Sequence, residues 1–194
     1  MSTLFAIAFQ IIAPGSADKP APLPLATLHP FTDKYYRCAE HPHDELSELG
    51  DALGQDCAIA ETKTGFTGDG SRNEDYDSWN ELLLAPIGGI VTRIRVNPVA
   101  NVPGTLGKPP ASTITFERYD GLKIVYAHVQ EIEVKVGEPV VPGQPVARIG
   151  NNGMSRSPHL HVGAWRGDQP YQIRWDLRAL GALRRAAKAA AQGK

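Results

Sequence analysis

The sequence predicts a mainly β protein with a short N-terminal helix, long loops and a C-terminal helix. Its 194 residues include 19 glycines and 16 prolines, which interrupt regular structure and favour short strands joined by structured loops. Its hydrophobic fraction of 42% is that of a globular domain with a buried core. From residue 82 onward, runs of strand-forming residues alternate with turn sequences, which is typical of a β-rich core.

The length suits one domain with appendages. We expect a signal segment or proline-rich lead-in over residues 1–30, a β-rich domain over 31–175 and a C-terminal helix over 176–194. The chain carries 20 Lys and Arg against 21 Asp and Glu, a net charge of −1. This balance gives no indication of a nucleic-acid partner, because nucleic-acid binding needs an excess of positive charge.

The apolar run from Leu4 to Ala13 has the length of a signal-peptide core, and small residues follow it. It is too short to span a bilayer as a helix, so no stable membrane span is expected. No Lys or Arg precedes the run, and a buried first strand is the alternative. A secretory signal would place the protein in the periplasm or outside the cell. Residues 18–30, with four prolines, are expected to form an extended tether or the lead-in to a strand.

The next segment combines a helix, a strand and a long loop. Leucines recur at helical spacing over 44–53, a strand is expected over 57–60, and 62–78 is a polar loop rich in Gly, Asp and Asn. Loops of this length inside a compact domain are often functional. Cys38 and Cys57 can close the intervening loop in an oxidising compartment, although two cysteines do not require a disulfide.

The β-rich core follows, and turn sequences separate its strands at 86–88, 119–121 and 137–139. The expected strands are Leu82–Ala85, Gly89–Val96, Ser112–Arg118, Lys123–His128, Glu131–Val136, Val146–Ile149 and His159–Trp165. Residues 97–110 form a loop rich in Pro and Gly. A helix is expected over Asp176–Ala191, with cationic side chains near its end that suit the helix dipole.

Three histidines suggest a metal-hydrolase site. His159 and His161 are separated by one residue in an expected strand, so their side chains project from the same face. His128 ends another expected strand. Imidazole is a frequent zinc ligand and moves protons readily near neutral pH.

Three motifs occur in order along residues 82–165. They are Leu84-Ala85-Pro86 with Gly88-Gly89-Ile90-Val91, Tyr126-Ala127-His128 with the turns at Gly137 and Gly143-Gln144, and Ile149-Gly150-Asn151-Asn152-Gly153 with Ser157-Pro158-His159-Leu160-His161. In residue type and spacing, the segment resembles the lysostaphin-type zinc metallopeptidases, which cut peptide cross-links in bacterial cell walls. The resemblance covers somewhat under half of the chain.

The resemblance implies a small, barrel-like antiparallel β-sheet groove of the duplicated hybrid motif type. It implies one Zn²⁺ ion, with His161 as a ligand, and a peptidoglycan peptide as substrate. His128 and His159 become the catalytic pair that orients the zinc-bound water and stabilises the tetrahedral intermediate. Three protein ligands would leave a coordination position open for catalysis.

The family's other two ligands lie in a His-x-Gly-x-Asp motif, whose nearest match here is Ala52-Leu53-Gly54-Gln55-Asp56. Asp56 is therefore the second expected ligand, but alanine stands where the histidine should be. We expect the third ligand to be His43, folded back over the site by the 44–53 helix and by a Cys38–Cys57 bond. The alternatives for this ligand are His41, Asp51 and Glu61.

Two other functions are compatible with parts of the sequence. The run from 134 to 149 is also typical of lipoyl and biotinyl carrier domains, but Lys135 lies inside an expected strand rather than at a hairpin tip. A metal-free family member that binds peptidoglycan or regulates a hydrolase would explain Ala52. The presence of His128, His159 and His161 together favours a zinc endopeptidase, because a binding module has no chemical need for all three.

Overall fold

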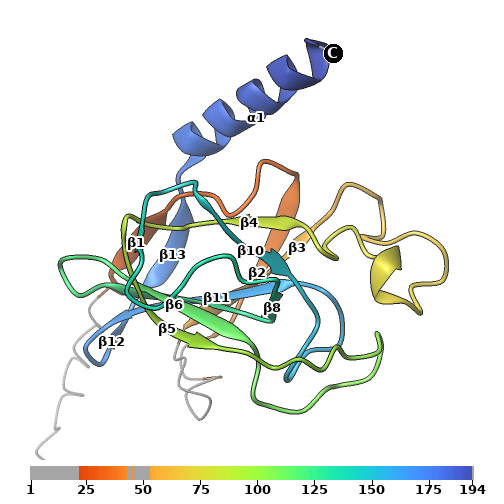
Figure 1. Cartoon of the computed structure of the whole chain (residues 1–194), viewed down its shortest axis with the longest axis horizontal. Helices are drawn as coiled ribbons and strands as arrows, with labels where there is room; N and C mark the ends of the chain where they lie inside the picture. The colour runs from red at the N-terminus through yellow and green to blue at the C-terminus, as the bar shows by residue number, and fades with distance from the viewer. Residues whose placement is uncertain (1–21, 43–44, 46–52, 194) are drawn as a thin grey trace, which may run out of the picture.

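The computed structural model describes residues 22–42, 45 and 53–193 (Figure 1). The apolar run Leu4–Ala13 and nearly all of the expected helix over 44–53 lie outside the described residues. The strands are β1 (Leu25–Leu28), β2 (Tyr36–Glu40), β3 (Gly54–Ile59), β4 (Leu82–Leu84), β5 (Gly89–Arg95), β6 (Thr113–Glu117), β7 (Lys123–Ala127), β8 (Val129–Gln130), β9 (Pro139–Val140), β10 (Pro145–Ile149), β11 (Leu160–Arg166), β12 (Gln169–Pro170) and β13 (Gln172–Trp175). A 3-10 turn, η2 (Asn73–Asp75), interrupts the long polar loop, and α1 (Leu177–Gln192) is the C-terminal helix.

The strands form one large antiparallel sheet and two small sheets. The large sheet has the strand order β2-β3-β11-β7-β6-β5-β9, and β12 pairs with β11. The order β4-β10-β8 makes a second antiparallel sheet, while β1 and β13 pair in parallel. The prediction of a mainly β protein with antiparallel strands and a C-terminal helix is confirmed.

The core lies between the large sheet and the β4-β10-β8 sheet. Alternate residues of β6 and β7 are fully buried, as expected for strands with one face on a core. The phenol of Tyr126 on β7 is completely buried among them and donates a hydrogen bond of 3.1 Å to the carbonyl of Leu84 on β4. This bond joins the two sheets directly, and the ring also packs edge-on against Phe116 at 5.4 Å.

Aromatic side chains secure the N-terminal strands. Phe31, which follows β1, is fully buried and packs against Tyr36 of β2 and Trp175 of β13, with ring centroids 4.5 and 5.2 Å apart. Burial raises the pKa of the Tyr36 phenol to about 12. This cluster ties the start of the large sheet to the β1–β13 pair.

The prediction of a strand over Glu131–Val136 is wrong. Its alternation of apolar residues buries Val134, but the segment has an irregular backbone, and it meets β10 through a bond from Glu133 N to Val146 O. The turn at Gly137, with φ of +88°, redirects the chain into β9. The alternation of apolar residues therefore indicated that one side of the segment is buried, and not that the segment belongs to a sheet.

Helix α1 extends away from the sheets and contains no buried residue (Figure 1). Asp176 caps its N-terminus by accepting hydrogen bonds from the amides of Arg178 and Ala179. Arg184 connects the helix to the body by donating to the carbonyls of Asp33 and Lys34. In the part of the chain that the structure describes, no helix is both long and apolar enough to cross a membrane.

Candidate metal centre

Strand pairing brings Asp56 and His161 together although 105 residues separate them. Asp56 lies in the middle of β3 and is the direct cross-strand partner of His161 on β11. Directly opposed residues of an antiparallel pair have side chains on the same face and in contact. Accordingly, His161 Nδ1 lies 2.8 Å from Asp56 Oδ1.

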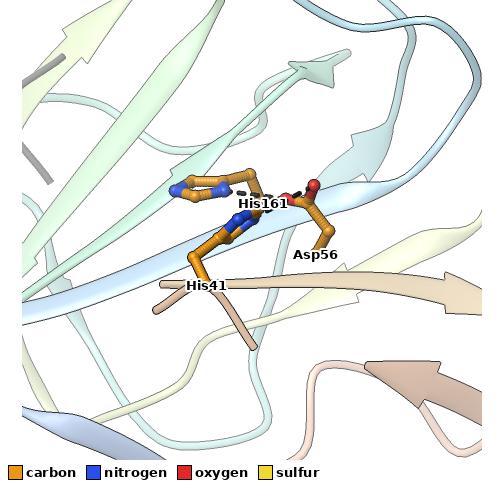
Figure 2. A group of neighbouring side chains, drawn as sticks. All are labelled: His41, Asp56 and His161. Atoms are coloured by element: carbon orange, nitrogen blue, oxygen red, sulfur yellow. Dashed lines mark hydrogen bonds and ion pairs between the residues drawn. The ribbon is translucent and has the colours of Figure 1, made fainter. Parts of the chain in front are cut away.

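His41 reaches the same carboxylate from the other side. It follows β2, where its amide donates to the carbonyl of Gly54 at 2.9 Å and continues the β2–β3 pairing. Because Ala39 pairs with Asp56, His41 projects from the same face of the sheet, two residues further along. Its Nε2 lies 3.2 Å from Asp56 Oδ2, and Figure 2 shows the two imidazoles converging on the carboxylate.

These three side chains fit a metal ion. One ligand atom from each of His41, Asp56 and His161 lies within 4.8 Å of the others. His41 Nε2 is buried and, although close to Asp56 Oδ2, makes no hydrogen bond of acceptable geometry with any residue that the structure describes. A buried nitrogen in this state is costly unless something else satisfies it. A cation between the nitrogen and the carboxylate would do so, and two imidazole nitrogens with one carboxylate oxygen are a donor set that suits Zn²⁺.

The Asp56 carboxyl is held in its charged form. Partial burial acts to raise its pKa, but the hydrogen bonds and charge interactions from His159 and His161 outweigh burial and hold the pKa well below the usual range. Asp56 is therefore an anion at neutral pH, as a metal ligand must be.

His128 lies beside this group in an unusual backbone conformation. It follows β7 with φ of 62°, a region that non-glycine residues seldom occupy and that is enriched at functional sites. Burial, reinforced by the neighbouring His159, lowers the pKa of His128 to about 3, so the ring is neutral at pH 7. Its Nδ1 donates to the carbonyl of Asn152 at 2.7 Å, which leaves the lone pair on Nε2.

His159 completes the cluster, with its ring centroid 4.7 Å from that of His128. Its Nδ1 donates to the carbonyl of Ser157 at 2.8 Å, and its Nε2 lies 3.5 Å from Asp56 Oδ1. The ring is thus fixed by a backbone group and directs Nε2 toward the carboxylate. His128 and His159 can each accept, hold and return a proton at Nε2.

Asn152 supports His128 with both its backbone and its side chain. Its side-chain oxygen accepts from the amide of Ser112, and its side-chain nitrogen donates to the carbonyl of Val129. The neighbouring Asn151 donates to Asn73 Oδ1, and Asn73 donates to the carbonyl of Asn101. The long polar loop is therefore tied through η2 to both the 97–110 loop and the loop that leads to His159.

Of the residues predicted for the site, Asp56, His128, His159 and His161 lie together. His43 and Asp51 lie outside the described residues, and Glu61 pairs with Lys34 at 3.5 Å instead. Among the described residues, His41 takes the place in the ligand set that was expected for His43. From the sequence, His43 was favoured over His41 without a prediction of β2. If β2 had been predicted with Cys38 opposite Cys57, the strand register would have placed His41 on the same face of the sheet as Asp56.

Residues 80–173 match peptidase family M23. No curated protein sequence matches the chain significantly. Among solved structures, the chain is similar to a zinc-containing peptidase from Vibrio cholerae (26% identity over 47% of this chain and 25% of that one, TM-score 0.38). It is also similar to the deep-sea M23 metalloprotease pseudoalterin (16% identity, 76% and 78%, TM-score 0.48) and to the catalytic domain of lysostaphin from Staphylococcus simulans (18% identity, 71% and 88%, TM-score 0.45).

The matched segment contains His128, His159 and His161 but begins after His41 and Asp56. The chain spans only a quarter of the length of the Vibrio cholerae peptidase.

Proposed function

Because residues 80–173 match peptidase family M23, we propose that the chain is a zinc-dependent endopeptidase that hydrolyses peptide cross-links of bacterial peptidoglycan. The ligands of the proposed zinc ion are His41, Asp56 and His161. This set differs from the motif expected for the family, because alanine occupies position 52 and the second imidazole comes from His41, directly after β2.

The convergence of His41, Asp56 and His161 is the observation that carries the proposal. Ala52 would by itself suggest that metal binding has been lost, yet a second imidazole lies against Asp56 with a buried Nε2 that lacks a hydrogen-bond partner. Burying such a group is unfavourable in a metal-free protein. A site that still binds metal therefore explains this arrangement better than a site that has lost its metal.

Zinc at this site would supply Lewis-acid chemistry by lowering the pKa of water and polarising a peptide carbonyl. The chain supplies the proton transfers. His128 is a neutral donor at Nδ1 to the carbonyl of Asn152 and keeps an Nε2 lone pair for a proton, while His159 donates Nδ1–H to the carbonyl of Ser157 and turns Nε2 toward Asp56. One imidazole can take the proton of the attacking water, while a protonated imidazole can stabilise the developing oxyanion and protonate the leaving amine.

The resemblance to lysostaphin-type enzymes supports the peptidoglycan substrate, and the disulfide supports the location. Cys38 and Cys57 are bonded, and structural disulfides persist in oxidising compartments. We therefore place the protein in the periplasm or outside the cell, where peptidoglycan is found.

Metal content tests the proposal most directly. The purified chain should contain about one zinc per molecule by elemental analysis, and its cleavage of peptidoglycan should be lost with a chelator and return with zinc. His41→Ala and His161→Ala should each purify without zinc and bind added zinc much more weakly than the parent chain. His29→Ala is the matched control, because His29 bonds to the carbonyl of Pro30 and contributes nothing to the cluster.

A chain that binds no zinc even when zinc is supplied would contradict the proposal. The metal-free binding or regulatory function would then be the better account. Zinc retained at full stoichiometry in His41→Ala would leave the metal site standing but would remove His41 from it.

A further inference from the structure

The strand that presents His41 is held in the sheet from one side only. Among the described residues, β2 is the edge strand of the large sheet and pairs with β3 alone. Only Tyr36 and Cys38 of its five residues are half-buried against the core, and the other three are exposed. Strand register is strongly specified where one face is buried and weakly specified where it is not. The position of β2 along β3 therefore depends on a few specific contacts.

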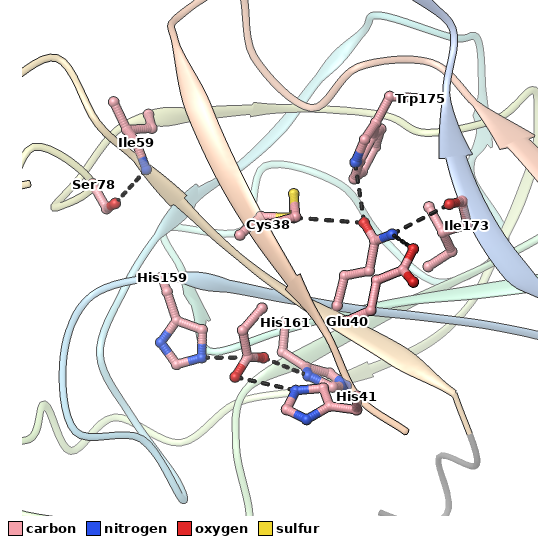
Figure 3. The surroundings of a disulfide bond; sticks show 12 residues. Cys38, Glu40, His41, Ile59, Ser78, His159, His161, Ile173 and Trp175 are labelled. Atoms are coloured by element: carbon pink, nitrogen blue, oxygen red, sulfur yellow. Dashed lines mark hydrogen bonds and ion pairs between the residues drawn. A yellow bond between two sulfur atoms is a disulfide. The ribbon is translucent and has the colours of Figure 1, made fainter. Parts of the chain in front are cut away.

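That position determines whether His41 faces the metal site. Side chains alternate along β2, so a slip of one residue would turn His41 to the opposite face. Figure 3 shows the two faces: His41 is turned toward His159 and His161, while Glu40 is turned toward Ile173 and Trp175. His41, at the end of an edge strand, is thus more sensitive to register than Asp56, whose strand β3 pairs with β2 on one side and with β11 on the other.

The Cys38–Cys57 disulfide fixes this register covalently. The two cysteines are direct cross-strand partners with Cα atoms 4.1 Å apart, and the adjacent pair is Ala39 with Asp56. Cys57 is fully buried, so the bond anchors the exposed strand to the core. Noncovalent support comes from Glu40, whose carboxylate accepts hydrogen bonds from Gln55 and Gln172 at 3.0 and 3.1 Å.

We propose that the Cys38–Cys57 disulfide is a positioning element of the metal site, which holds β2 in the register that presents His41 Nε2 to the ion. This inference rests on the proposed function, because it requires His41 to be a ligand. It assigns the disulfide a role in metal affinity that is separate from general stabilisation of the fold. Loss of support for a metal ligand typically weakens metal affinity by about 10- to 100-fold.

The test replaces both cysteines by valine in the full chain. Cys38→Val/Cys57→Val removes the covalent bond and the thiols, which would otherwise bind zinc themselves, and keeps an apolar β-branched pair across the strands. Zinc affinity is measured by competition with a chromophoric chelator, and the visible spectrum of the cobalt(II)-substituted protein reports the ligand geometry. We expect the affinity to fall by about 10- to 100-fold and the cobalt spectrum to change. Circular dichroism checks that the fold is retained.

The same pair of substitutions in a His41→Ala background separates positioning from stability. If the disulfide acts through His41, removing it there should weaken zinc binding further by less than about twofold, because the two changes are not additive. Equal losses in both backgrounds would show that the bond supports the fold in general, and would overturn the inference. Unchanged zinc affinity in the folded valine pair would also overturn it.

Failure to fold is a decisive result as well. If neither the valine pair nor Cys38→Ala/Cys57→Ala folds, the bond is a determinant of the whole fold, and a specific role in positioning is rejected. Failure of the unmodified chain to bind zinc is a distinct result, since it removes the proposed metal site and with it this inference.

Discussion

His128 and His159 show how the chain sets the chemistry of a single residue. Both rings donate Nδ1–H to a backbone carbonyl, His128 to that of Asn152 and His159 to that of Ser157, and this contact fixes the orientation of each ring. Burial keeps His128 neutral by lowering its pKa to about 3. The His128 backbone, with φ of 62°, departs from the usual strand conformation directly after β7. Position, protonation and orientation of this side chain are thus all fixed before any substrate binds.

Removal of the His128 imidazole should separate turnover from metal binding. We expect His128→Ala to keep its zinc, because the ring is not one of the three proposed ligands, and to lose kcat by about a hundredfold or more, as for a lost acid–base group. Steady-state kinetics and zinc content, measured on the same preparation, check the two halves of this expectation. Turnover equal to that of the parent chain would exclude His128 from the reaction.

At the scale of elements, the strands from β4 onward show where prediction from the sequence succeeded, and β2 shows where it failed. Most strands from β4 onward were predicted within a residue or two, since Gly and Pro turns bound them and their apolar residues alternate. β2 carries no such signal: none of the residues in its sequence Tyr-Arg-Cys-Ala-Glu is fully buried, because the strand occupies an edge of the sheet, and only Tyr36 and Cys38 are half-buried against the core. Without β2, the position of His41 could not be derived. Asp56 and the three later histidines could be predicted because short motifs carry them.

The contact between the two antiparallel sheets makes a prediction at the same scale. Tyr126→Phe removes the phenolic hydroxyl, which is fully buried with its ring, and leaves the carbonyl of half-buried Leu84 with one partner fewer. We expect a loss of about 1–2 kcal/mol in the free energy of unfolding, measured by urea denaturation. Tyr119→Phe is the control, because Tyr119 is 98% exposed and its substitution should change stability by less than about 0.5 kcal/mol. Equal effects of the two substitutions would show that the hydrogen bond does not stabilise the contact between the sheets.

At the scale of the whole molecule, the three proposed ligands connect β2, β3 and β11, which are neighbours in one sheet although β11 is distant in sequence from the other two strands. A metal held by all three strands binds the folded state and not the unfolded chain, so it must stabilise the fold as a whole. At a free zinc concentration of one hundred times Kd, the stabilisation should be about 2.7 kcal/mol.

Thermal unfolding with and without a chelator measures this effect. We expect the Tm of the parent chain to fall when zinc is removed and to recover when zinc is restored. His161→Ala should show a low Tm that does not respond to zinc. A Tm that is insensitive to zinc in the parent chain would mean that the metal, if bound, does not link these strands.

The 105 residues between Asp56 and His161 also bear on the biosynthesis of the protein. During synthesis the chain emerges from its N-terminus, and the β2–β3 hairpin is complete about a hundred residues before β11 has been made. Closing a loop of this length carries an entropic cost that a pair of strands cannot offset until β7 and β11 are present to form the sheet. The β2–β3 hairpin presents only His41 and Asp56, so the set of three proposed ligands is complete only once β11 has joined the sheet. Full coordination of the proposed ion is thus tied to the last of these strands to be synthesised.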